Sequence, residues 1–314
     1  MKQPIILVNK HGRPSMKGVY KAIGGDLKLL IKSSRFNGYV ERQKGVRKKL
    51  VGVEQPDCSN AICIRWGSRA SVKTNEHSIV YNKNEAVEKT NSKGECRRIL
   101  REAGVPIPDT YLLGEDMTNI KFPAIGRPEH HGRGAHFFVC NNHADIENAK
   151  RRGCTYFSTL YPKTKEYRLH CAKGKILAIM EKPRPINPTS HAWNRALNDA
   201  PFSVVDRKDW DIDICRLALQ ACETMNLCFS AIDIMAFAGE GYPKAVVCEL
   251  NCAGTINSSP YVHDKYVKFF KWLFASDKRR PTWNYKTFKK VESLAWKEEQ
   301  LLPTFEIPEE NRLK

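Results

Sequence analysis

The stretch that decides the fold is AIDIMAFAGEGYPKAVVCELN, residues 231–251. Two apolar, β-rich runs flank a segment of glycine, proline and polar residues, and this pattern predicts an antiparallel hairpin. A loop centred on Gly241 places Asp233 directly across from Glu249. Because side chains alternate along a strand, Glu249 and Asn251 share a face, and Asp233 joins them.

The two faces of this hairpin have different predicted roles. Good core residues fall on one face: Ile232, Ile234, Cys248 and Leu250. The other face collects two carboxylates and an amide, which are hard oxygen ligands suited to Mg²⁺ whose shell is completed by phosphates. The alternative is an amphipathic hairpin with its polar face in water. Two facing acids repel each other without a cation, so the metal interpretation is favoured.

A helix is predicted shortly after residue 90. Ser92 followed by Glu95 has the spacing of a capping box. Apolar residues then recur at helical spacing, at Cys96, Ile99, Leu100 and Ala103. Gly104 stands where a glycine commonly ends a helix. Further along, the basic and glycine-rich connection RPEHHGRG, residues 127–134, joins two predicted strands.

These segments resemble the ATP-grasp superfamily, in the group that contains glutathione synthetases and the ligases that add glutamate to ribosomal proteins. Residues 231–251 resemble its metal-binding end, and residues 91–110 its lead-in helix. FPAIGRPEHHGRGAHFFV, residues 122–139, resembles its glycine-rich hairpin, and EYRLHCAKGKILAIMEK, residues 166–182, a strand pair that bears a functional arginine. The resemblance covers roughly residues 75–260. The basic, compact chain also resembles phage-encoded carboxylate–amine ligases.

The resemblance implies an α/β (α+β) protein with an N-terminal domain and a two-part core that sandwiches the nucleotide. The implied divisions are an N-terminal α/β pre-ATP domain at 1–88, a small subdomain with the glycine-rich hairpin at 89–165, a large subdomain with the metal site at 166–290 and a C-terminal tail at 291–314. The implied activity is ATP- and Mg²⁺-dependent. It joins a carboxylate to an amine, on an amino acid or peptide, through an acylphosphate, and it releases ADP.

The resemblance also assigns roles to individual residues. The metal ligands are Asp233, Glu249 and Asn251. The nucleotide contacts are Lys93, Arg127, His131, Gly132, Arg133, Gly134 and Lys182. Arg168 and Arg127 are the catalytic candidates, because cations stabilise the charge that develops on phosphate and on the tetrahedral intermediate. Asn194 and Arg195 lie in an irregular loop and are candidate substrate contacts.

Two departures from the family pattern stand out. Arg127 occupies the place of a second phosphate-facing lysine, which keeps the charge but changes the geometry. The acid expected near the adenine and ribose is missing from YFSTLYPKTK, residues 156–165, which leaves the preference for ATP open.

Simpler accounts of these residues also stand. Arg168 is equally explained by an ion pair with Glu166 two residues away, and Lys93 by an exposed lysine. The 127–134 connection is an ordinary turn if its glycines only supply positive φ. The histidines lack the spacing of a zinc site.

Composition limits the function classes. The net charge is +18, and it is concentrated in residues 1–50, with 13 Lys/Arg against 2 Asp/Glu, and in residues 261–290, with 9 against 2. Such charge favours an acidic partner, such as nucleic acid or an acidic peptide, unless it is only a solvated surface. The 11 cysteines include no CxxC pair, so free thiols are expected. No apolar run approaches the roughly 20 residues that span a bilayer, and a cytoplasmic location is expected.

Two other function classes remain open. The ATP-grasp scaffold also hosts enzymes that stop at phosphorylation, so a kinase of an acidic small molecule is the first alternative. A nucleic-acid-binding protein on a degenerate ligase scaffold, using the two basic segments, is the second.

Overall fold

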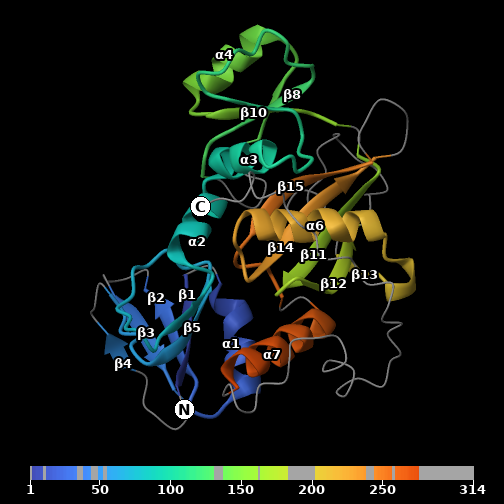
Figure 1. Ribbon diagram of the computed structural model, residues 1–314. Coiled ribbons are helices and arrows are strands. Elements are labelled where there is room, and N and C mark those ends of the chain that lie inside the picture. Colours follow the sequence, from blue (N-terminus) through green and yellow to red (C-terminus); the bar gives the residue numbers. More distant parts are fainter. Residues whose placement is uncertain are drawn as a thin grey trace.

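The computed structural model shows a chain built around three β-sheets (Figure 1). It describes residues 2–9, 12–33, 38–43, 49–51, 55–130, 137–161, 163–182, 202–237, 244–256 and 259–275. The predicted tail at 291–314 lies outside these ranges. Within them, no helix is long and apolar enough to cross a membrane.

The first sheet is mixed and has the strand order β4-β3-β2-β1-β5-β6. Its strands are β1 Gln3–Val8, β2 Lys28–Lys32, β3 Tyr39–Arg42, β4 Lys49–Val51, β5 Ala61–Trp66 and β6 Ile79–Tyr81. The central strand β1 is parallel to β2 and β5, and β5 is parallel to β6. Helix α1, Arg13–Ile23, connects β1 to β2. This unit matches the α/β class predicted for the N-terminal segment.

The second sheet is small and antiparallel, with the order β7-β10-β8-β9. Its strands are β7 Thr110–Leu112, β8 Ala124–Arg127, β9 Phe138–Cys140 and β10 Tyr156–Thr159. Helix α4, His143–Arg151, packs on it through Ile146 and Ala149. Strands β8 and β9 form the predicted hairpin around the glycine-rich connection.

The third sheet is antiparallel and carries the hairpin from which the fold was predicted. Its order is β13-β12-β11-β14-β15. The strands are β11 Lys165–Ala172, β12 Lys175–Lys182, β13 Ser203–Val204, β14 Phe229–Ala236 and β15 Ala245–Asn251. Helix α6, Ile212–Thr224, lies along one face of this sheet (Figure 1). The side chain of Asp211 caps α6.

Helix α7, Pro260–Phe274, joins the first and third sheets. Its aromatic residues share one core with α1, β1, β5 and β12, and Figure 1 shows α7 beside α1. Ser259 caps α7 and Pro260 is its first residue. Burying this apolar stripe between two sheets stabilises their relative position, at about 25 cal/mol per Å² of apolar surface.

Two consecutive helices, α2 at Asn84–Asn91 and α3 at Lys93–Glu102, connect the first sheet to the second. The predicted apolar stripe of α3 is buried against α6 and the third sheet. Gly104 ends this segment with φ of 70°, as predicted. The predicted capping box is wrong, because Ser92 makes no side-chain hydrogen bond to its own helix and Glu95 pairs with Arg98.

Candidate metal and nucleotide site

A row of charged side chains crosses three adjacent strands of the third sheet. Arg168 on β11 lies across from Asp233 on β14, and Asp233 lies across from Glu249 on β15. The predicted pairing of Asp233 with Glu249 is therefore confirmed. Asn251 stands two residues further along β15, and its amide nitrogen lies 3.4 Å from Oδ2 of Asp233.

The register changes immediately after the pair of acids. Ile234 pairs with Val247, so Cys248 is an extra residue that forms a bulge. Because a bulge shifts the following side chains by one position, Val247 joins Ile232, Ile234 and Leu250 in the buried core. The prediction of Cys248 as a core residue of this face is wrong, and its side chain is partly exposed.

Arg168 and Asp233 form a two-pronged ion pair. The Nε and Nη2 atoms of Arg168 donate to Oδ1 and Oδ2 of Asp233 at 2.6 and 2.7 Å. The ring of Phe202 lies 4.9 Å from the guanidinium carbon. Burial lowers the pKa of Arg168, but Asp233 and other nearby carboxylates raise it by more, so it lies above its usual value. The guanidinium therefore stays charged.

The ion pair between Arg168 and Glu166 that sequence reasoning kept open is not formed. Glu166 lies 2.5 Å from Nζ of Lys163 and 3.6 Å from Nζ of Lys182. Lys182 is 2% exposed, and burial lowers its pKa below the usual value. Lys182 therefore lies beside the row as a buried cation, and its role as a nucleotide contact stays a prediction.

Lys93, the first residue of α3, supplies a cation at the other end of the row. Its Nζ lies 2.9 Å from Oε1 of Glu249 and donates to the backbone oxygen of Leu250 at 2.9 Å. Burial lowers the pKa of Lys93, and Glu249 is the first of the groups that raise it, leaving it above the usual value. Lys93 is therefore not an exposed lysine.

These contacts change the argument for a metal. Asp233 and Glu249 each face a protein cation, so repulsion between the two acids no longer requires an ion. The case now rests on the convergence of two carboxylates and the Asn251 amide on one strand pair. That donor set fits Mg²⁺, which takes one or two carboxylates and leaves places for phosphates. The proposed set contains only two acids beside the amide of Asn251. Among the described residues, no group of three or more His, Cys, Asp or Glu is placed to hold a metal ion.

Arg127 lies on the small sheet, at the end of β8. It pairs across strands with Tyr156 on β10. Burial holds the pKa of Tyr156 above its usual value, and Glu249 raises it further. Arg97 and Arg127 act in the opposite direction and lower it. These charged groups therefore lie around one buried phenol, where the small sheet meets the edge of the third sheet.

Several predicted site residues lie outside the described ranges. They are His131, Gly132, Arg133 and Gly134 in the glycine-rich connection, and Asn194 and Arg195 in the 183–201 segment. His170, one of the histidines without zinc-site spacing, is a buried residue whose Nδ1 lies 3.3 Å from the hydroxyl of Tyr266.

No protein-family model matches the sequence, and neither does any curated protein sequence. Solved structures do match. The ATP-grasp ligase PsnB, complexed with minimal precursor, Mg and ADP, has a TM-score of 0.58 at 13% identity, covering 86% of this chain and 97% of PsnB. The chain has the ATP-grasp fold. The resemblance seen in the sequence is thereby confirmed at the level of fold.

Two further solved structures are similar to the chain over most of their length. The macrocyclase MdnC from Microcystis aeruginosa MRC, bound with precursor peptide MdnA, has a TM-score of 0.53 at 14% identity, covering 85% of this chain and 99% of MdnC. An ATP-grasp RimK domain protein from Sphaerobacter thermophilus DSM 20745 has the same TM-score and identity, covering 85% of this chain and 98% of that protein.

Two site residues escaped sequence reasoning. Arg97 lies one turn after Lys93 on α3 and donates to the backbone oxygen of Cys248 at 3.1 Å, so both cations bind carbonyls of the edge strand β15. Their i, i+4 spacing was the available signal. Glu129, in the glycine-rich connection, binds the start of α3. No local sequence pattern predicts a contact between residues so far apart in sequence.

Proposed function

We propose that the chain is an ATP- and Mg²⁺-dependent ligase that joins a carboxylate to an amine. The observation that carries this proposal is the row of Arg168, Asp233 and Glu249 on an ATP-grasp fold, closed at its far end by Lys93. Two adjacent carboxylates with a protein cation at each end suit a site that has to receive both a metal ion and the phosphates of a nucleotide.

Asp233, Glu249 and Asn251 would hold the metal. The backbone needs no rearrangement for this, because two adjacent strands already bring the two carboxylates and the side-chain amide of Asn251 together. When bound, Mg²⁺ offsets negative charge on the phosphates of ATP. Asp233 is 7% exposed, so little water would screen the attraction between its carboxylate and the metal ion.

The remaining cations would act on the substrates. Arg168, Arg127, Lys93 and Lys182 would orient phosphate oxygens and stabilise the oxyanion of the tetrahedral intermediate. In the proposed reaction a carboxylate oxygen attacks the γ-phosphorus and ADP leaves. The amine nitrogen then attacks the acyl carbon, phosphate leaves, and the amine loses a proton. In this reaction no side chain forms a covalent bond with a substrate.

An acidic peptide is the proposed substrate class. PsnB and MdnC have been described in complexes with precursor peptides, and the net charge of +18 favours an acidic partner here. One part of the charge argument is corrected by the structure. Lys265 on α7 is 1% exposed and lies 4.7 Å from the ring of Tyr261, so it does not belong to a solvent-facing basic surface.

The test is a screen for ADP release with Mg²⁺ present, over amino acids, acidic peptides and nucleic acids, with the products resolved by mass spectrometry. An amide product, lighter by one water than the sum of its two substrates, supports the ligase. A phosphorylated product that accumulates supports the kinase. Binding of nucleic acid without ATP turnover supports the binding-protein alternative, and either of these two outcomes contradicts the proposal.

A further inference from the structure

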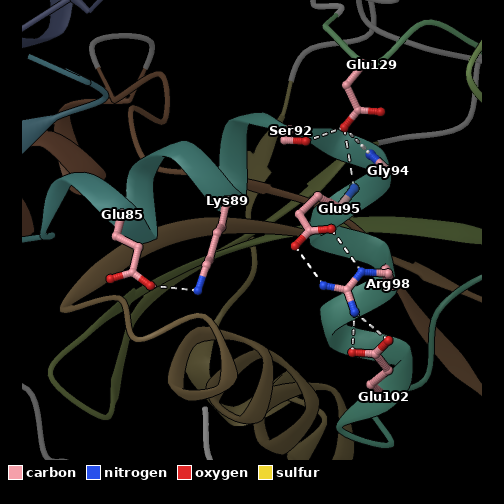
Figure 2. A network of polar contacts seen from close by, with 8 residues as sticks. All are labelled: Glu85, Lys89, Ser92, Gly94, Glu95, Arg98, Glu102 and Glu129. Atoms are coloured by element: carbon pink, nitrogen blue, oxygen red, sulfur yellow. Dashed lines mark hydrogen bonds and ion pairs between the residues drawn. The ribbon is translucent and has the colours of Figure 1, made fainter. Parts of the chain in front are cut away.

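The carboxylate of Glu129 caps helix α3 from outside the helix (Figure 2). One of its oxygens accepts hydrogen bonds from the hydroxyl of Ser92 and from the backbone N–H groups of Gly94, at 3.0 Å, and Glu95, at 3.4 Å. Its second oxygen accepts from the hydroxyl of Thr155 at 3.3 Å. The first N–H groups of a helix lack acceptors within the helix. Here Glu129, a residue of the glycine-rich connection, provides acceptors for them.

Glu129 also holds the residue that reaches the proposed metal ligand. Its backbone oxygen accepts from the backbone N–H of Lys93 at 3.3 Å. Lys93 in turn contacts Glu249 through its Nζ at 2.9 Å. Lys93 is 9% exposed, so little water is available to replace either contact. A continuous set of contacts thus runs from the small sheet, through the start of α3, to the third sheet.

We propose that Glu129 is a positioning residue for the nucleotide site. It fixes the start of α3 so that Lys93 stays against Glu249, and it thereby couples the glycine-rich connection to the proposed metal ligands. This inference rests on the proposed function. Because a carboxylate already occupies the positive end of α3, the phosphates bind elsewhere.

Gly94 provides a second way to disturb the same contact. A Cβ added at Gly94 would lie 2.7 Å from Oε2 of Glu129 and 3.3 Å from a methyl carbon of Leu112. The change Gly94→Ala therefore pushes the carboxylate away, although alanine favours a helix over glycine. Helix propensity alone predicts that Gly94→Ala stabilises α3 and does no harm to the site. The positioning role predicts that the same substitution weakens nucleotide binding.

Calorimetric titration with Mg²⁺ and the ATP analogue AMPPNP tests the inference. Glu129→Ala and Gly94→Ala are each expected to bind about tenfold more weakly than the wild type, about 1.4 kcal/mol. Glu102→Gln, which removes an acid from the exposed end of the same helix, is the control and is expected to bind normally. Unchanged affinity in both test variants would leave Glu129 a cap alone, and tighter binding would mean that phosphate uses the helix end.

A double variant shows whether Glu129 acts through Lys93. Combined with Lys93→Met, the change Glu129→Ala is expected to cause no further loss of affinity, because residues that act as a unit are not additive. Fully additive losses would contradict the proposal.

A measurement without nucleotide separates this inference from the proposed function. Lysine acetylation followed by mass spectrometry is expected to leave Lys93 protected in the wild type and to label it several-fold faster in Glu129→Ala. Lys89, whose side chain is 34% exposed, serves as the internal control. Protection of Lys93 in the variant would overturn the positioning role. If Lys93 is protected in the wild type and labelled faster in Glu129→Ala, but the wild type binds no AMPPNP, only the proposed function is contradicted.

Discussion

The guanidinium of Arg168 binds both carboxylate oxygens of Asp233, at 2.6 and 2.7 Å, on adjacent strands at the centre of the third sheet. The residue proposed to stabilise reaction charge is thus the internal counter-ion of a proposed metal ligand. Stability and metal binding are therefore linked at this pair, and suitable variants can separate them.

Asp233→Asn is expected to abolish Mg²⁺-dependent ATP turnover and to lower the free energy of unfolding by about 3–5 kcal/mol, because it leaves a buried guanidinium without its charged partner. Adding Arg168→Met should recover most of the stability in urea unfolding but no turnover. Recovery of turnover in the double variant would remove Asp233 from the metal site.

Glu249→Gln provides the comparison. The Glu249 side chain is 26% exposed, against 9% for Asp233, so its stability loss should be smaller while turnover is lost equally. Wild-type turnover in Glu249→Gln would contradict the assignment of the ligands.

Arg97 is expected to stabilise the junction between the small and third sheets. It donates to the hydroxyls of Thr110 and Ser158 at 3.0 and 2.6 Å, in addition to the backbone oxygen of Cys248. Arg97→Met should cost about 2–3 kcal/mol of unfolding free energy, since hydrogen bonds to charged groups are the stronger ones. Its neighbour Arg98 forms exposed ion pairs, so Arg98→Gln should cost less than about 1 kcal/mol. Equal effects in denaturant titrations would contradict this account.

His170 makes stability depend on pH. Burial, followed by the charge of Arg168, lowers its pKa from 6.5 to about 3. The unfolded chain therefore binds a proton below pH 6.5 that the folded chain does not bind, and stability falls as the pH drops. Between pH 7 and 5 the loss from this group should be about 2 kcal/mol. Thermal unfolding of His170→Gln should show a shallower dependence over this range, and a slope equal to that of the wild type would exclude His170 as its source.

The basic segments predict that binding of an acidic peptide depends on salt. Its affinity should fall steeply between low and physiological ionic strength, and replacing Arg42, Arg47, Lys48 and Lys49 by glutamine should weaken the peptide but not AMPPNP. Fluorescence titrations over a salt series measure both. A flat response would mean that the charge serves solubility only.

The hairpin of residues 231–251 shows how far sequence reasoning reaches. Alternation and turn composition placed Asp233 across from Glu249 correctly, because both signals are local. The bulge at Cys248 was missed, since one extra residue leaves the apolar pattern almost unchanged. Contacts that form only after folding were missed as well. Glu129 replaced the expected capping box from 37 residues away, and Asp233 replaced Glu166 as the partner of Arg168.

The most direct test of the account is a crystal structure grown with Mn²⁺ and AMPPNP, with anomalous diffraction used to locate the metal. The account predicts an anomalous peak within coordination distance of Asp233, Glu249 and Asn251, with the phosphates of the nucleotide completing the shell. A metal bound elsewhere, with Asp233 still paired to Arg168 and Glu249 to Lys93 while AMPPNP is bound, would contradict it.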